Sequence, residues 1–245
     1  AHLHPQPQLS LYAPLEELPF QSILTTHSTH ITAQAGLNKF VALTNIGTGS
    51  SHSSVPSTCK DLSADDVADL ERYLDATKSA LLFARKVILV EGPAELLLIP
   101  ALVKKVLGID LDRAGITVVP IYGVHFDVYA KLFSKQGLPK KCAIIADGDL
   151  SPSDATESDL SEEDAPLDLP DLSKLKSKYV KVFSNRTTFE RAVTVRGNIG
   201  MFAATAKSLG ATTVGAQLAR WGREWAQHDA GSVEARRLEM QCKSK

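Results

Sequence analysis

Five carboxylates stand where they could share a metal ion. Glu91 directly follows the apolar run KVILV, and Glu95 comes four residues later. Asp147 and Asp149 follow the apolar run CAIIA, and Glu190 lies in NRTTFER. Two carboxylates about 4 Å apart repel by roughly 4 kcal/mol at an effective dielectric of about 20, so a crevice holding several needs cations or protons. All-oxygen ligands favour hard divalent ions, Mg²⁺ above all, with Mn²⁺ and Ca²⁺ as alternatives.

Such a site would suit phosphoryl transfer. A divalent metal beside a phosphodiester polarises phosphorus, generates hydroxide and stabilises the leaving oxygen. Gly92 and Gly148, next to the acids, would let a phosphate approach the backbone closely. Taken singly, Glu95 could complement a helix dipole, Glu190 is typical of a surface helix, and Asp-x-Asp is a common turn. The combination of Glu-Gly after one strand and Asp-Gly-Asp after another therefore carries the prediction of a metal site.

The alternation of strand-like and helix-like segments in the sequence predicts the elements that position these acids. Strands are expected at residues 20–25, 39–44, 86–90, 116–121, 142–146 and 179–183. Helices are expected at residues 63–84, 93–107 with a kink or early break at Pro100, 126–136, 187–195, 198–209, 213–228 and 232–241. Residues 1–19, 45–60 and 150–172 are expected to be an irregular lead-in, a linker or exposed loop, and an acidic loop. Alternating strands and helices indicate an α/β fold with a parallel sheet and helices on both faces. In such sheets, sites form beyond the carboxyl ends of the strands.

Charge is distributed unevenly along the 245 residues. The net charge is −1, yet residues 147–171 hold ten acidic residues and no Lys or Arg. The chain from residue 172 onward is basic, which indicates a polyanion as a partner or a solvated helical surface. Arg186, Arg191 and Arg196 are candidates for contacts with a nucleic-acid backbone.

Other classes of protein are disfavoured. The longest apolar runs fall well short of the roughly 20 residues that span a bilayer, and no signal peptide is visible, so no membrane partner is expected. The three cysteines, Cys59, Cys142 and Cys242, form no Cys-x-x-Cys pair, which argues against structural zinc and favours a reducing compartment, the cytoplasm.

The two acidic motifs resemble those of Toprim domains, which bind Mg²⁺ in topoisomerases, primases and certain nucleases. The segments that contain and connect these motifs read KVILVEGPAELLLIPAL, GIDLDRAGITVVPIYG and CAIIADGDL. They resemble the OLD (overcoming lysogenization defect) family of ATP-dependent nucleases, in which an ABC-type ATPase precedes a C-terminal Toprim domain. The resemblance extends over roughly residues 85–200.

The resemblance implies roles for particular residues. Metal ligands are expected, directly or through water, at Glu91, Glu95, Asp147, Asp149, Ser151 and Glu190. The family's functional lysine near the end of the Toprim region corresponds to Lys245 or Lys243, and Lys245 would neutralise charge in the transition state. SILTTHSTHIT resembles the last segment of an ABC ATPase, in which His27 would be the switch histidine that senses the γ-phosphate of ATP.

The chain has neither a Gly-x-x-x-x-Gly-Lys-Ser/Thr loop nor a Walker B strand, so ATP is expected only through a missing part of the ATPase domain. The expected organisation is an ATPase tail and linker at 1–58, a connecting helix at 59–84, and a Toprim domain with C-terminal helices at 85–245. The expected function is a two-metal DNA endonuclease, homodimeric in the full-length protein, with its own ATPase domain as partner. Topoisomerase or primase activity, or a non-catalytic dimerisation or regulatory module, are the alternatives.

Overall fold

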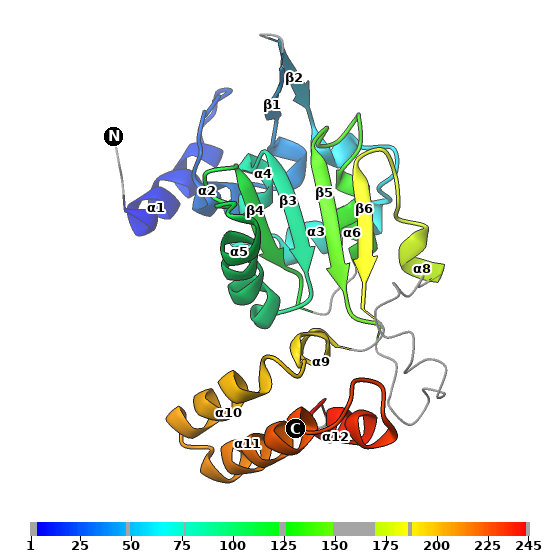
Figure 1. Ribbon diagram of the computed structural model, residues 1–245. Coiled ribbons are helices and arrows are strands. Elements are labelled where there is room, and N and C mark those ends of the chain that lie inside the picture. Colours follow the sequence, from blue (N-terminus) through cyan, green and yellow to red (C-terminus); the bar gives the residue numbers. More distant parts are fainter. Residues whose placement is uncertain are drawn as a thin grey trace. The chain divides into compact units, whose positions relative to one another are not determined.

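The protein divides into two compact units (Figure 1). A computed structural model describes residues 4–47, 50–75, 77–122, 126–148, 170–185 and 188–243. The first unit falls within residues 1–146 and 168–184, and the second within residues 147–167 and 185–245. The domain limits expected from the sequence stay a prediction.

The first unit is built on a four-stranded parallel sheet in the order β4-β3-β5-β6. Its strands are β3 (Lys86–Val90), β4 (Ile116–Pro120), β5 (Lys141–Ala146) and β6 (Val180–Ser184). Each lies within one residue of its predicted limits, which confirms the α/β prediction. Continuous apolar runs form these strands because helices cover the sheet.

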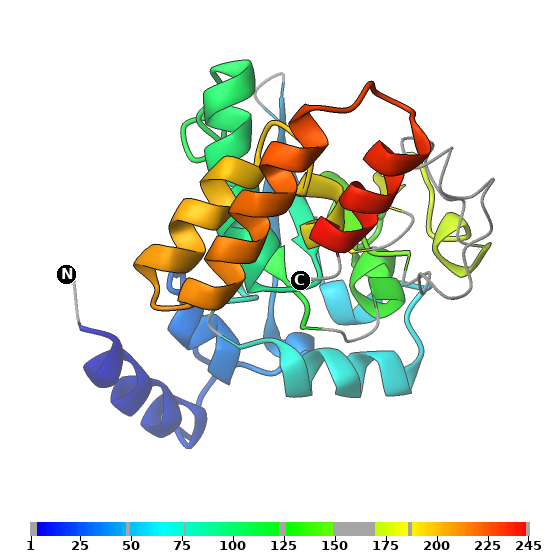
Figure 2. The ribbon, with the colours of Figure 1, turned by 60° about the horizontal axis from the view of Figure 1, so that its bottom comes forward.

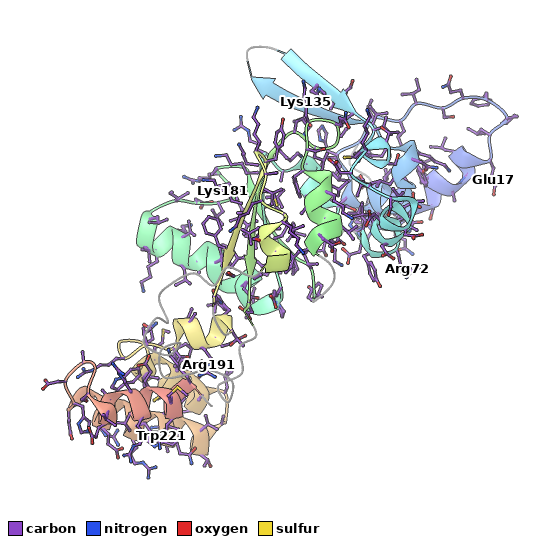
Figure 3. All side chains as sticks on the ribbon, turned by 90° about the vertical axis from the view of Figure 1, so that its right-hand side faces the viewer. Glu17, Arg72, Lys135, Lys181, Arg191 and Trp221 are labelled. Atoms are coloured by element: carbon purple, nitrogen blue, oxygen red, sulfur yellow. The ribbon has the colours of Figure 1, made fainter. Side chains whose placement is uncertain are left out.

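Helices cover both faces of this sheet (Figures 1 and 3). On one face, Val87, Leu89 and Ile144 are buried in a core that also receives side chains from the helices α3 (Ala64–Tyr73), α4 (Ala80–Phe83) and α6 (Phe126–Leu132). On the other face lies α5 (Pro93–Leu107). This helix continues through Pro100, so the early break expected there is absent. It ends at Gly108, whose φ of 68° is the left-handed conformation that favours glycine.

The single helix expected at 63–84 is instead two helices. Ser63 and Asp66 form the predicted capping box at the start of α3, and the Lys131 ammonium on α6 contacts both oxygens of Asp66 at 2.9 Å. After Tyr73 the chain leaves the helix, and the Asp75 carboxylate accepts the backbone N–H of Lys78 at 2.8 Å. Such a local side-chain bond offers the backbone an alternative to the helix, which explains the interruption.

The N-terminal expectations were partly wrong. Residues 20–25 form no strand: residues 21–28 have no regular structure, and Phe20 and Ile23 are 65% and 87% exposed. The expected irregular lead-in contains the helix α1 (Pro5–Glu16), with proline at its first position. The expected loop at 45–60 contains a strand of an antiparallel hairpin. The remaining N-terminal elements are α2 (Thr29–Gln34), η1 (Leu37–Lys39), β1 (Ala42–Gly47), β2 (Ser50–Ser54) and η2 (Pro56–Thr58).

The second unit is helical, as predicted (Figure 2). Its helices are α9 (Phe189–Val193), α10 (Ile199–Ser208), α11 (Thr212–Ala226) and α12 (Val233–Lys243), and α8 (Pro170–Ser173) belongs to the first unit. Helices α10 and α11 approach closely at Gly215, where a Cβ atom would lie 2.8 Å from the Ala203 carbonyl oxygen. Among the described residues, no helix combines the length and apolarity needed to cross a bilayer.

Candidate functional site at the carboxyl edge of the sheet

The four parallel strands end along one edge, here called the carboxyl edge (Figure 1). Glu91 directly follows β3, Asp147 directly follows β5 and Asn185 directly follows β6, whereas Tyr122 is the second residue after β4. The register pairs Val90 with Ile145 and Ala146 with Ser184. The strand ends that carry these residues are therefore neighbours in the sheet.

Asp147 and Asn185 are joined by a hydrogen bond. The Asn185 amide donates from Nδ2 to Asp147 Oδ1 at 2.8 Å, and both residues are half-buried. The amide thereby fixes the orientation of a carboxylate expected to bind metal, which is how outer contacts usually hold a ligand. Sequence reasoning missed Asn185, which is the first residue after β6 and the second residue after the strand predicted at 179–183.

Glu91 is held through its backbone by Tyr122. The Tyr122 N–H donates to the Glu91 carbonyl at 2.7 Å. Tyr122 has a φ of 58°, and no other described non-glycine residue has a positive φ. A left-handed conformation costs roughly 1–2 kcal/mol for such a residue, so its surroundings must stabilise it. Glu91 is half-buried, and the Tyr122 ring is 53% exposed.

A buried lysine supports the Tyr122 ring. The Lys78 ammonium lies 5.4 Å from the ring centroid, within the range of a cation–π interaction. Lys78 is 7% exposed and contacts Asp75 Oδ2 at 3.0 Å. Burial acts to raise the pKa of Asp75, but hydrogen bonds from the Lys78 backbone and side chain outweigh it and hold that pKa below its usual range. No pattern in the sequence predicted this buried cation next to Tyr122.

Glu95 has a structural contact of its own. It is 5% exposed, and its Oε2 accepts the Gly92 N–H at 3.1 Å, at the start of α5. Glu95 therefore stabilises the N-terminus of α5, which is the alternative role expected for it from the sequence. A carboxylate has two oxygens and this bond uses one of them, so the bond is compatible with metal coordination by Glu95.

Five predicted site residues remain: Asp149, Ser151, Lys245, Glu190 and His27. Asp149, Ser151 and Lys245 lie outside the described residues. Glu190 is exposed on α9 in the second unit. His27 lies in the first unit with its ring 5.8 Å from that of Phe83, in a pocket that also contains Lys86, the first residue of β3. It is therefore at the opposite edge of the sheet from Glu91.

The donors at the carboxyl edge suit a hard divalent cation in their chemistry. Glu91, Asp147 and Asn185 all offer oxygen atoms, the ligands preferred by Mg²⁺ and Mn²⁺. Within the described ranges, no three His, Cys, Asp or Glu side chains already stand together as a metal-binding cluster. The ligand set expected from the sequence therefore remains a prediction, with two of its members, Asp149 and Ser151, beyond those ranges.

In comparisons with known proteins, residues 82–149 match the family model of the overcoming lysogenization defect protein-like TOPRIM domain. Among solved structures, the C-terminal region of the Xanthomonas campestris pv. campestris OLD protein is 29% identical, with 65% of this chain and 80% of that chain covered and a TM-score of 0.43. The C-terminal region of the Burkholderia pseudomallei OLD protein is 27% identical over 66% of this chain and 81% of that chain, with a TM-score of 0.40. No curated protein matches.

The matched segment contains the elements that build the carboxyl edge. It spans β3, α5, β4, α6 and β5, together with Glu91, Glu95 and Asp147. Its strands are parallel and adjacent, as the predicted fold requires. Residues 82–149 of this chain are therefore an OLD-like Toprim domain.

Proposed function

We propose that this Toprim domain is a metal-dependent endonuclease that hydrolyses phosphodiester bonds in DNA. The observation that carries the proposal is the placement of Glu91 and Asp147, which directly follow the adjacent strands β3 and β5 at the carboxyl edge. That both lie in a segment matching an OLD-like Toprim domain supports nucleic acid as the substrate.

Each residue has a proposed task. Glu91, Asp147 and Asp149 bind Mg²⁺, and Glu95, Ser151 and Glu190 complete the ligand set directly or through water. When bound, two ions supply an activated water and stabilise the departing 3′ oxygen. Asn185 holds the Asp147 carboxylate, and Tyr122 holds the Glu91 backbone. Lys245 neutralises charge as the phosphate is attacked.

The resemblance to OLD family proteins leads to further proposals for the full-length protein. ATP is bound by an ATPase part that this chain does not contain, and His27 senses its γ-phosphate. DNA and that ATPase domain are the partners, the full-length protein is a homodimer, and the compartment is the cytoplasm. Mn²⁺ or Ca²⁺ can replace Mg²⁺ for binding.

The test is cleavage of supercoiled plasmid DNA with Mg²⁺ or Mn²⁺, with and without EDTA. Asp147→Asn removes the charge that holds the metal and is expected to slow nicking by about 10²-fold or more. Asp112→Asn is the matched control, because Asp112 is an exposed carboxylate beyond α5, away from the carboxyl edge. Asp112→Asn should cleave at the wild-type rate.

A binding measurement separates the metal site from catalysis. Asn185→Ala should weaken Ca²⁺ or Mn²⁺ binding by about 10-fold in calorimetry, because the orienting bond to Asp147 is lost. Wild-type cleavage by Asp147→Asn would reject the ligand assignment. Metal binding without cleavage of any DNA would favour the non-catalytic module.

A further inference from the structure

The opposite edge of the sheet, where the parallel strands begin, is rich in cations. Arg85 and Lys86 lie at the start of β3, Lys141 at the start of β5, and Lys178 and Lys181 on either side of the first residue of β6. All five side chains are exposed. They are referred to here as the basic edge.

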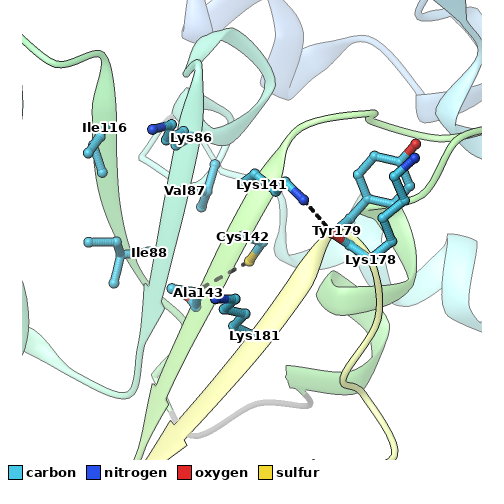
Figure 4. Close-up of a pocket in the computed structure, with 10 residues that line it drawn as sticks. All are labelled: Lys86, Val87, Ile88, Ile116, Lys141, Cys142, Ala143, Lys178, Tyr179 and Lys181. Atoms are coloured by element: carbon cyan, nitrogen blue, oxygen red, sulfur yellow. Dashed lines mark hydrogen bonds between the residues drawn. The ribbon is translucent and has the colours of Figure 1, made fainter.

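Two adjoining hollows lie at this edge. One, of about 420 Å³, is lined by Lys86, Lys141, Lys178 and Lys181 along three strands (Figure 4). The other, of about 730 Å³, shares Lys86, Lys141 and Tyr179 with the first and extends to Arg85 and His27. Every charged residue lining either hollow is basic. The two hollows therefore form one continuous, positively charged surface.

Within the described part of the chain, no carboxylate forms an ion pair with these five residues; the ion pairs found there involve other side chains. The Lys141 ammonium instead donates to the Lys178 carbonyl at 2.6 Å. The Lys141 and Lys178 ammonium groups lie 5.8 and 5.9 Å from the centre of the Tyr179 ring. The edge thus combines a positive field with an aromatic ring that two of its cations approach and that is partly buried against the core.

We propose that the basic edge binds the sugar–phosphate backbone of a nucleic-acid strand. Lys and Arg contacts to phosphates position a strand without reading its sequence, and positively charged grooves follow the backbone of single strands. Because the basic residues are spread over three strands and two adjoining hollows, an extended polyanion suits them better than a small one. The five residues of β3 separate this edge from Glu91 by about 16 Å, so the surface is distinct from the proposed cleavage site.

Binding is measured in EDTA by fluorescence anisotropy of a labelled single-stranded oligonucleotide over a range of salt concentrations. Lys86→Gln/Lys141→Gln removes two phosphate contacts, so the slope of log Kobs against log salt should become shallower by about 1.4. Lys105→Gln/Lys135→Gln is the control, because these exposed lysines lie outside both hollows and the charge change is equal. The control slope should equal that of the wild type.

Equal slopes for the two double variants would overturn the proposal. So would competition by poly-glutamate as strong as that by DNA, which indicates an acidic protein partner, or by tripolyphosphate, which indicates a small anion. Thermal unfolding of each variant checks the fold, and Lys86→Gln/Lys181→Gln repeats the test with the Lys141 contact to Lys178 intact. Because no metal is present, the result is independent of whether the chain cleaves DNA.

Discussion

Lys140 is a buried ammonium whose titration should be visible in the stability of the protein. It is 7% exposed and donates to the carbonyls of Leu82 and Ala84 at 2.8 Å and of Leu81 at 3.3 Å. These are the groups at and just beyond the end of α4, where carbonyls lack helical partners. Burial lowers the pKa of Lys140 from 10.5 to about 8.

The sign of the effect follows from proton binding. Between about pH 8 and 10.5, the unfolded chain holds the Lys140 proton and the folded chain does not. The free energy of unfolding therefore rises with pH in this window. At neutral pH both states are protonated, and the burial of the charge costs at most about 3 kcal/mol. From about pH 7 to about pH 9.5, the Lys140 contribution should rise by about 2 kcal/mol.

Urea denaturation followed by far-UV circular dichroism measures this contribution when wild type and Lys140→Met are compared. The variant loses the donor to three carbonyls, which shifts its stability by the same amount at every pH. The difference between wild type and variant should therefore increase by about 2 kcal/mol over the window, while other lysines and tyrosines cancel. A flat or falling difference would show that Lys140 keeps its proton in the folded state and that the reasoning is wrong.

Two further predictions concern the backbone. Tyr122→Val should destabilise the protein by about 2 kcal/mol relative to Tyr122→Asn in urea denaturation, because asparagine tolerates a positive φ and a β-branched residue does not; equal stabilities would contradict the left-handed conformation. Gly215→Ala should destabilise the second unit by about 1–3 kcal/mol, since the new Cβ meets the facing helix. Gly200→Ala is its control, because its Cβ would meet open space, and tryptophan fluorescence reports this unit since Trp221 and Trp225 are the chain's two tryptophans; equal unfolding temperatures would refute the close packing.

Several features of the candidate site depend on neighbours that are distant in sequence. Asn185 is an ordinary loop residue until β5 and β6 pair and bring it to Asp147. Lys78 becomes a buried cation only where the chain leaves α3 and meets Tyr122. The run FQSILT has the composition of a strand, but it forms none, and its apolar side chains are exposed. Local pattern predicts what a segment prefers, and packing decides whether that preference is used.

The amino-acid pattern was enough to predict the central sheet of this protein and the carboxylates that follow its strands. Runs such as KVILV and CAIIA can be satisfied only by burial between layers, and the acid after each must then stand at the strand's end. The contact of Asn185 with Asp147 and the gathering of lysines at the other edge of the sheet depend on tertiary packing. Lys86, Lys141 and Lys181 are spread over nearly a hundred residues of chain, and the parallel register of β3, β5 and β6 brings them together. Lys86 pairs with Lys141, and Lys181 pairs with Ala143, two residues further along β5.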